Sequence, residues 1–154
     1  MGKHHSKLKK EEILGSMGSA RLEVNSFRDQ KIQKLKDHEK ELVEMISALE
    51  QGFQEYRMKA TVCVRYVKYV QATKIMLEMI SRMTEILSPE KPKREEFEGE
   101  FLPNLRSVMW GLEKIKVDLR EFQELMVTAF GKRIVMYGDE GEDVDKEVSF
   151  EEFL

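Results

Sequence analysis

The residues of this chain that could bind a metal ion or attack a substrate are few and widely spaced. His4, His5 and His38 lack the spacing of a metal site, and His38 fits the surface of a helix. Cys63 is the single cysteine and lies in an apolar run without a nearby histidine, so we expect a small core residue. Glycine-rich phosphate loops and nucleophile-elbow motifs are absent from the sequence. The sequence therefore predicts a protein without enzymatic activity, cofactor or metal.

The N-terminus carries a pattern for covalent lipid attachment. Gly2 and Ser6 fit the N-myristoylation motif, which would make Gly2 the acylated residue. One myristoyl chain binds membranes only marginally, so a second signal is needed. An unmodified leader or a cloning remnant is the alternative explanation of the Met-Gly start.

Basic residues would supply that second signal, at about 1 kcal/mol each near an anionic leaflet. The candidates are Lys3, Lys7, Lys9, Lys10, Arg21, Arg28, Lys31 and Lys34. For those in the first helix, the alternative is an ordinary solvated helix face.

The charges are separated along the chain. Residues 1–40 carry ten Lys and Arg against six Asp and Glu, whereas residues 136–154 carry eight acidic residues against Lys146 alone. This polarity favours an anionic partner at the basic end and an acidic tail that folds back on it. The aromatic residues in the basic region are too sparse for a nucleic-acid platform, so we expect no nucleic-acid partner.

The acidic tail has a faint similarity to a calcium loop. Asp143, Asp145, Ser149 and Glu152 fall near ligand positions. Gly141 stands where the first aspartate belongs, however, and Lys146 replaces the glycine of the turn. A flexible acidic tail is therefore the favoured interpretation.

Long apolar stripes at helical spacing predict the elements that carry these residues. We expect helices over residues 19–51 and 54–87, the second apolar on two sides and covered on both. A linker is predicted over 88–100, with Pro103 in the first turn of a new helix. The first and last stripes consist of Ile32, Leu35, Leu42, Ile46, Leu49 and Phe53, and of Leu105, Val108, Leu112, Ile115, Leu119, Phe122, Met126 and Ala129.

Local signals subdivide the last stripe. Asp118 and Glu121 have the spacing of a capping box, which predicts two helices meeting near Val117. Gly131 is a candidate C-cap, and Trp110 is expected in the core. The resulting organisation is a basic tail over 1–18, a helical core domain over 19–135 and an acidic tail over 136–154.

Residues 20–135 taken together resemble the ESCRT-III superfamily. The stretch from Ile46 to Ile80 resembles the hairpin turn and second helix of that group, which archaeal cell-division relatives share. The stretch from Leu105 to Val135 is similar to the increased-sodium-tolerance branch, including the ending Phe130-Gly131-Lys132. The resemblance implies an all-α fold, with a long antiparallel hairpin and one or two further helices packed along it.

The resemblance also implies a function. The expected protein is a membrane-associated subunit that polymerises with itself and related helical subunits to remodel or cut membranes. It would be cytoplasmic and peripheral, on an endosomal or division-site membrane. The tail is short for the family, but its end could dock on an AAA ATPase through Val148, Phe150, Phe153 and Leu154. A cytosolic helical adaptor or coiled-coil module without a membrane role is the alternative.

Overall fold

Helices make up nearly all of the structure, a computed structural model that describes residues 2–49 and 52–132, with side chains from residue 9 onward. No strand occurs in these two ranges, which confirms the predicted all-α fold built on a helical hairpin. The elements are α1 (Gly2–Ala48), α2 (Phe53–Leu87), α3 (Arg94–Glu96), the π-helix η1 (Phe97–Phe101), α4 (Leu102–Ile115) and α5 (Arg120–Phe130).

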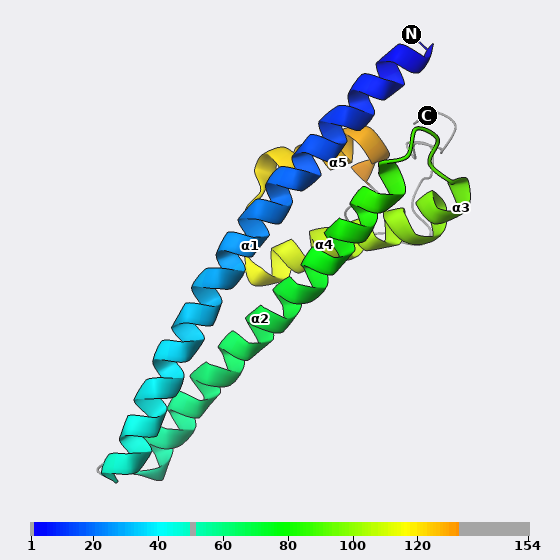
Figure 1. Ribbon diagram of the computed structural model, residues 1–154. Helices are drawn as coiled ribbons and strands as arrows, with labels where there is room; N and C mark the ends of the chain where they lie inside the picture. Colours follow the sequence, from blue (N-terminus) through cyan, green and yellow to red (C-terminus); the bar gives the residue numbers. More distant parts are fainter. Residues whose placement is uncertain (1, 50–51, 133–154) are drawn as a thin grey trace. The chain divides into compact units, whose positions relative to one another are not determined.

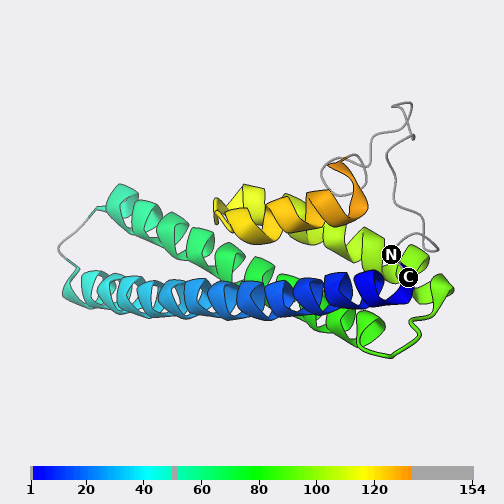
Figure 2. The same ribbon diagram turned by 90° about the horizontal axis from the view of Figure 1, so that it is seen from above.

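The chain divides into two compact units, Glu23–Ile75 and a second that joins Met1–Leu22 to Met76–Leu154. We refer to them as the hairpin unit and the core unit. In the hairpin unit, α1 and α2 lie side by side and run antiparallel (Figures 1 and 2). Aromatic contacts join the two helices there, with Phe27 edge-on to Tyr69 at 6.1 Å and His38 stacked on Tyr66 at 5.2 Å between ring centroids.

Helix α1 starts well before Ser19, where the sequence predicted the first helix to begin. Ile13, Met17 and Ala20 follow one another at helical spacing, and all three are buried in the core unit. Gly15 and Gly18 lie in the same turns, each with its missing side chain directed into open space. Burial of this apolar face outweighs a glycine cost of about 1 kcal/mol per residue, so the helix continues through both.

The segment between α2 and the next helix is shorter than the linker that was predicted over 88–100. Helical structure resumes at Arg94, and the π-helical turn η1 leads directly into α4. Phe97 and Phe101, four residues apart, stack at 5.2 Å and both contact the ring of Phe130. This aromatic cluster is fully buried and holds residues 94–101 in the core unit, although their sequence is polar and contains Gly99.

An ion-pair cluster fastens α3 and η1 to α2 within the core unit. Arg82 donates from Nε to Glu100 at 2.6 Å and from a terminal nitrogen to Glu96 at 3.0 Å. Glu85 accepts a third hydrogen bond at 3.2 Å. The neighbouring guanidinium lowers the pKa of Glu100, and these carboxylates raise the pKa of Arg82.

The last stripe is divided near Val117, as predicted. Helix α4 has a proline in its first turn and ends at Lys116, which adopts a left-handed conformation (φ 58°). Val117 then donates to the carbonyl of Leu112 at 3.0 Å, which completes a Schellman arrangement. The predicted capping box is not formed, because α5 is preceded by Leu119 and has no side-chain cap. Gly131 ends α5, as predicted.

Candidate interaction surface

The basic residues of α1 that were predicted to face a membrane, as far as the structure describes their side chains, differ in exposure. Arg21 and Lys34 are exposed, whereas Lys9 and Arg28 are half-buried. The Nε atom of Arg28 is buried without a hydrogen-bond partner among the described residues. Lys10 is half-buried too, and its ammonium donates to the carbonyl of Pro89. The side chains of Lys3 and Lys7 lie outside the described part of the chain.

The eighth candidate, Lys31, is surrounded by aromatic rings. Its Nζ atom lies 4.9 Å from the ring centroid of Phe27, 5.5 Å from that of Tyr66 and 5.2 Å from that of Tyr69. Phe27 belongs to α1, while the two tyrosines belong to α2. Because cation–π attraction holds the ammonium between the helices, we assign Lys31 to packing of the hairpin unit.

His38 belongs to a polar cluster between the two helices of the hairpin unit. Its Nδ1 atom lies 2.7 Å from Nζ of Lys59, which also donates to Glu41. This hydrogen bond to Lys59 lowers the pKa of Glu41. His38 is half-buried and stacked on Tyr66, so the expectation of a plain surface histidine is wrong.

Cys63 is buried on the α2 side of the hairpin unit, as the sequence predicted. Desolvation is the main cause that raises the pKa of its thiol. The neutral thiol is favoured, which suits a packing role and disfavours nucleophilic chemistry.

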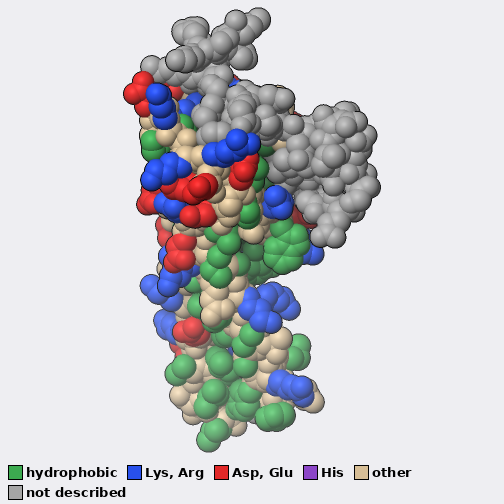
Figure 3. All heavy atoms as spheres, turned by 90° about the vertical axis from the view of Figure 1, so that its right-hand side faces the viewer, with side chains coloured by type: hydrophobic (Ala, Val, Ile, Leu, Met, Phe, Trp, Pro, Cys, Tyr) green, Lys and Arg blue, Asp and Glu red, His purple; other side chains and the backbone are tan. Residues whose placement is uncertain are grey.

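An exposed apolar patch lies at the end of the hairpin unit, where α1 and α2 meet. Leu49 is 80% exposed and Phe53 is 75% exposed. The patch, which we call the hairpin tip, consists of Val43, Ile46, Leu49, Phe53 and Met58. Figure 3 shows hydrophobic side chains gathered at the bottom of the visible face. The last part of the first apolar stripe is therefore uncovered, rather than buried as its periodicity suggested.

Most of the exposed large apolar side chains that the structure describes belong to the hairpin unit. Nine large apolar side chains are exposed in the described residues, and seven of them lie between residues 23 and 75. Exposed apolar side chains that gather in one patch, as at the hairpin tip, mark interaction sites more often than isolated apolar residues do. The first apolar stripe of the sequence included Ile46, Leu49 and Phe53 of this set, but it could not show that these three side chains lack a covering helix.

Among the described residues outside the hairpin unit, Trp110 is the main exposed aromatic residue. It is 59% exposed on α4, and Nζ of Lys114 lies 5.3 Å from its ring centroid. The prediction of a core tryptophan is wrong, because the buried face of α4 is formed instead by its neighbours Val108, Met109, Gly111 and Leu112.

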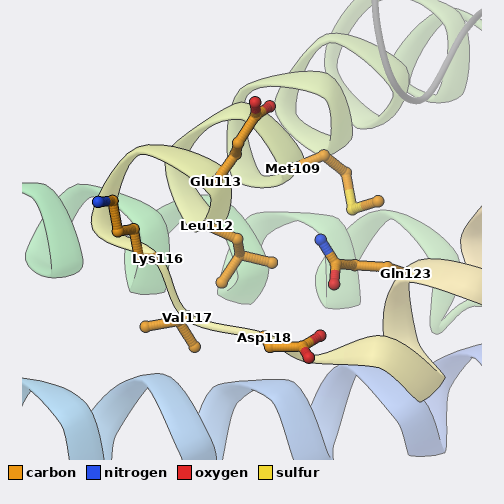
Figure 4. A pocket seen from close by; sticks show the side chains of 7 residues that line it. All are labelled: Met109, Leu112, Glu113, Lys116, Val117, Asp118 and Gln123. Atoms are coloured by element: carbon orange, nitrogen blue, oxygen red, sulfur yellow. The ribbon is translucent and has the colours of Figure 1, made fainter.

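A shallow pocket in the core unit lies beside the turn between α4 and α5. Its volume of about 280 Å³ is just below the lower end of the usual range for ligand clefts, roughly 300 Å³. Figure 4 shows the side chains of Met109, Leu112 and Gln123 directed toward the space, with Glu113 and Asp118 on opposite sides. Two separated, exposed carboxylates do not make a catalytic pair or a metal site.

Two further features bear on function. Across the described residues, no group of histidine, cysteine and acidic side chains has a geometry that could hold a metal ion. In the same part of the chain, no helix is both long enough and apolar enough to pass through a bilayer. The acidic tail, with Val148, Phe150, Phe153 and Leu154, lies outside the residues that the structure describes.

Comparisons with known proteins identified no relative of this chain. A scan against protein-family models, a search of curated proteins and a search of solved structures each found no match.

Proposed function

We propose that the protein is a non-enzymatic helical subunit that assembles side by side with further copies on an anionic membrane surface. The observation that carries this proposal is the exposed hairpin tip of Val43, Ile46, Leu49, Phe53 and Met58. Each Leu, Ile, Phe or Met side chain that becomes fully covered contributes roughly 1.5–3 kcal/mol. Covering the tip with a neighbouring subunit therefore favours association.

Assembly and membrane binding support each other in this proposal. Each subunit contributes a few weak contacts with the lipid surface, and the assembly adds them into a tight, multivalent interaction. A myristoyl group on Gly2 would add to the affinity, because one acyl chain becomes effective once a second signal is present. The setting that we propose is the cytoplasmic face of an endosomal or division-site membrane, where such assemblies remodel or cut the bilayer.

The acidic tail has a regulatory role in the same proposal. Residues 136–154 carry eight acidic side chains against one lysine, which suits a segment that covers basic surface before assembly. Salt should weaken such a contact. The apolar residues from Val148 to Leu154 would then engage the partner that takes the assembly apart, a role that we assign to an AAA ATPase.

The decisive experiment combines vesicle sedimentation with electron microscopy of the full chain. We expect the protein to sediment with acidic vesicles and to form ordered assemblies on them. Leu49→Asp should reduce assembly, and it should not strain the turn, because aspartate tolerates the positive φ of 55° at this position. Leu22→Asp is the matched control, since Leu22 is 72% exposed but lies in the core unit.

Two outcomes would contradict the proposal. A chain that stays monomeric at all concentrations, with and without acidic vesicles, would exclude assembly. Self-association that ignores vesicles, or capture of a single partner helix by the hairpin tip, would instead support the second candidate, a cytosolic helical adaptor. The exposed apolar tip suits that candidate too, because an amphipathic helix could cover it.

A further inference from the structure

One face of α2 in the hairpin unit combines cations with exposed apolar side chains. Arg57, Thr61, Val64, Lys68, Gln71 and Ile75 are all exposed. They follow one another at steps of three or four residues, which places them along a single side of the helix. We call this the α2 stripe. It extends for about 27 Å along the helix at a rise of 1.5 Å per residue.

The α2 stripe lies in a segment without acidic residues. Between Glu55 and Glu78 the sequence has five cations, Arg57, Lys59, Arg65, Lys68 and Lys74, and no aspartate or glutamate. All except Lys59 are exposed. Among the described residues, none of the ion pairs involves any of these four exposed cations. Their charge is therefore available to an external partner.

The facing part of α1 is different. Residues 23–48 carry five Lys and Arg against six Asp and Glu, so positive charge there is offset along the same helix. The ammonium of Lys31 also makes cation–π contacts with three aromatic rings. The contrast between the two helices concentrates the net positive charge of the hairpin unit on α2.

Apolar side chains lie among these cations. Val64 is 52% exposed and Ile75 is 51% exposed. Lys and Arg side chains accompany hydrophobic ones on the lower part of the face shown in Figure 3. Cations that attract anionic headgroups, together with apolar groups that enter the boundary with the acyl chains, are typical of a helix lying in a membrane interface.

We infer that the α2 stripe, with Arg65 and Lys74 beside it, is the surface that binds anionic lipid. This inference rests on the membrane role proposed above and moves the lipid-binding surface from α1 to α2. The hairpin unit lies with this side of α2 on the bilayer, so that Arg57, Arg65, Lys68 and Lys74 meet phosphate and carboxylate groups. Val64 and Ile75 enter the interface between them.

The test compares two double variants of the full chain in sedimentation with vesicles of phosphatidylcholine and phosphatidylserine. Arg65→Gln with Lys68→Gln should weaken binding about 30-fold, since two cations near an anionic surface contribute about 2 kcal/mol together. Lys34→Gln with Lys36→Gln is the matched control, which removes two exposed cations from α1. The control should bind nearly as well as the unchanged protein, and circular dichroism should show the same helicity for all three.

A position-specific readout complements sedimentation. An environment-sensitive fluorophore on Gln71→Cys, in a Cys63→Ala background, should shift to the blue with anionic vesicles. The same fluorophore on Lys36→Cys should not shift. Vesicles of phosphatidylcholine alone should leave both signals unchanged.

The outcomes separate this inference from the function on which it rests. If the α1 control loses binding while the α2 variant keeps it, the inference is overturned but the membrane role stands. If the unchanged protein ignores anionic vesicles, the membrane role fails as well. Binding of the stripe to a peptide of residues 136–154 or to duplex DNA, with no binding to vesicles, would identify another anionic partner and overturn the lipid assignment.

Discussion

The ammonium of Lys31 lies 4.9 Å from the ring centroid of Phe27, within the hairpin unit. Tyr66 and Tyr69 of α2 complete its surroundings. We therefore expect Lys31→Met, which keeps the length of the side chain but removes its charge, to lower the free energy of unfolding by about 0.5–2 kcal/mol. Urea unfolding followed by circular dichroism measures this loss.

Lys34→Met serves as the control for that change, because Lys34 is exposed and contacts no ring in the described residues. It should leave the stability nearly unchanged. If Lys31→Met abolished vesicle binding while leaving stability intact, the assignment of Lys31 to packing would be wrong.

The Arg82 cluster should make the stability of the core unit depend on pH. Arg82 lowers the pKa of Glu100 below its ordinary value of 4.5 in the folded state, so the folded protein holds this proton less tightly than the unfolded chain. The resulting stabilisation is present above about pH 4.5 and disappears as the pH falls through the folded pKa. Lys59 has the same effect on the pKa of Glu41, so the hairpin unit adds to the dependence.

Arg82→Gln should flatten this acid-side loss of stability. Urea midpoints measured from neutral to acidic pH would show a smaller slope than those of the unchanged protein. Arg65→Gln, which removes a cation without a carboxylate partner among the described residues, should keep the original slope. Equal slopes for both variants would show that the Arg82 cluster does not perturb Glu100.

Truncating a residue of the aromatic cluster should destabilise the core unit much more than truncating Trp110. Phe101→Ala should cost about 3–5 kcal/mol, because Phe101 is fully buried between Phe97 and Phe130. Trp110→Ala should cost less than about 1 kcal/mol, because the ring is exposed and contributes mainly its contact with Lys114. Comparable losses in urea unfolding would mean that Trp110 is covered in solution.

The left-handed residue at the end of α4 offers a stabilising change. Lys116 has a positive φ, which glycine adopts without the steric cost that other residues incur. We expect Lys116→Gly to raise the free energy of unfolding by about 0.5–1 kcal/mol. Glu124→Gly, on the exposed side of α5, should lower it by about 1 kcal/mol. A loss of stability at both positions would contradict the Schellman end of α4.

The sequence predicted those elements whose boundaries depend on local signals. The helix predicted over residues 54–87 agrees with α2, and Pro103 and Gly131 mark a first turn and a helix end as expected. The start of α1 and the helix at residues 94–101 were missed. Both are formed through burial against segments distant in the sequence, a contribution that helix propensity and breaker residues do not record.

The surface that we propose for lipid binding differs from the one that the sequence predicted. Charge counts pointed to the basic front of the chain, because counting along a sequence does not distinguish a free ammonium from one enclosed by rings. The sequence did contain one signal for the α2 stripe, since no acidic residue occurs between Glu55 and Glu78. Its importance becomes clear only when Arg57, Lys68 and their neighbours are seen to be exposed on one side of α2.

The sequence by itself determined the helical class and the separation of charge, because a period of three to four residues and the order of ionisable side chains are local properties of the chain. Tertiary structure alone decided that Leu49 and Phe53 are uncovered, that Trp110 faces outward and that Lys31 is enclosed. The burial of a side chain depends on which distant segment packs against its helix face. An amphipathic stripe in the sequence does not identify that segment.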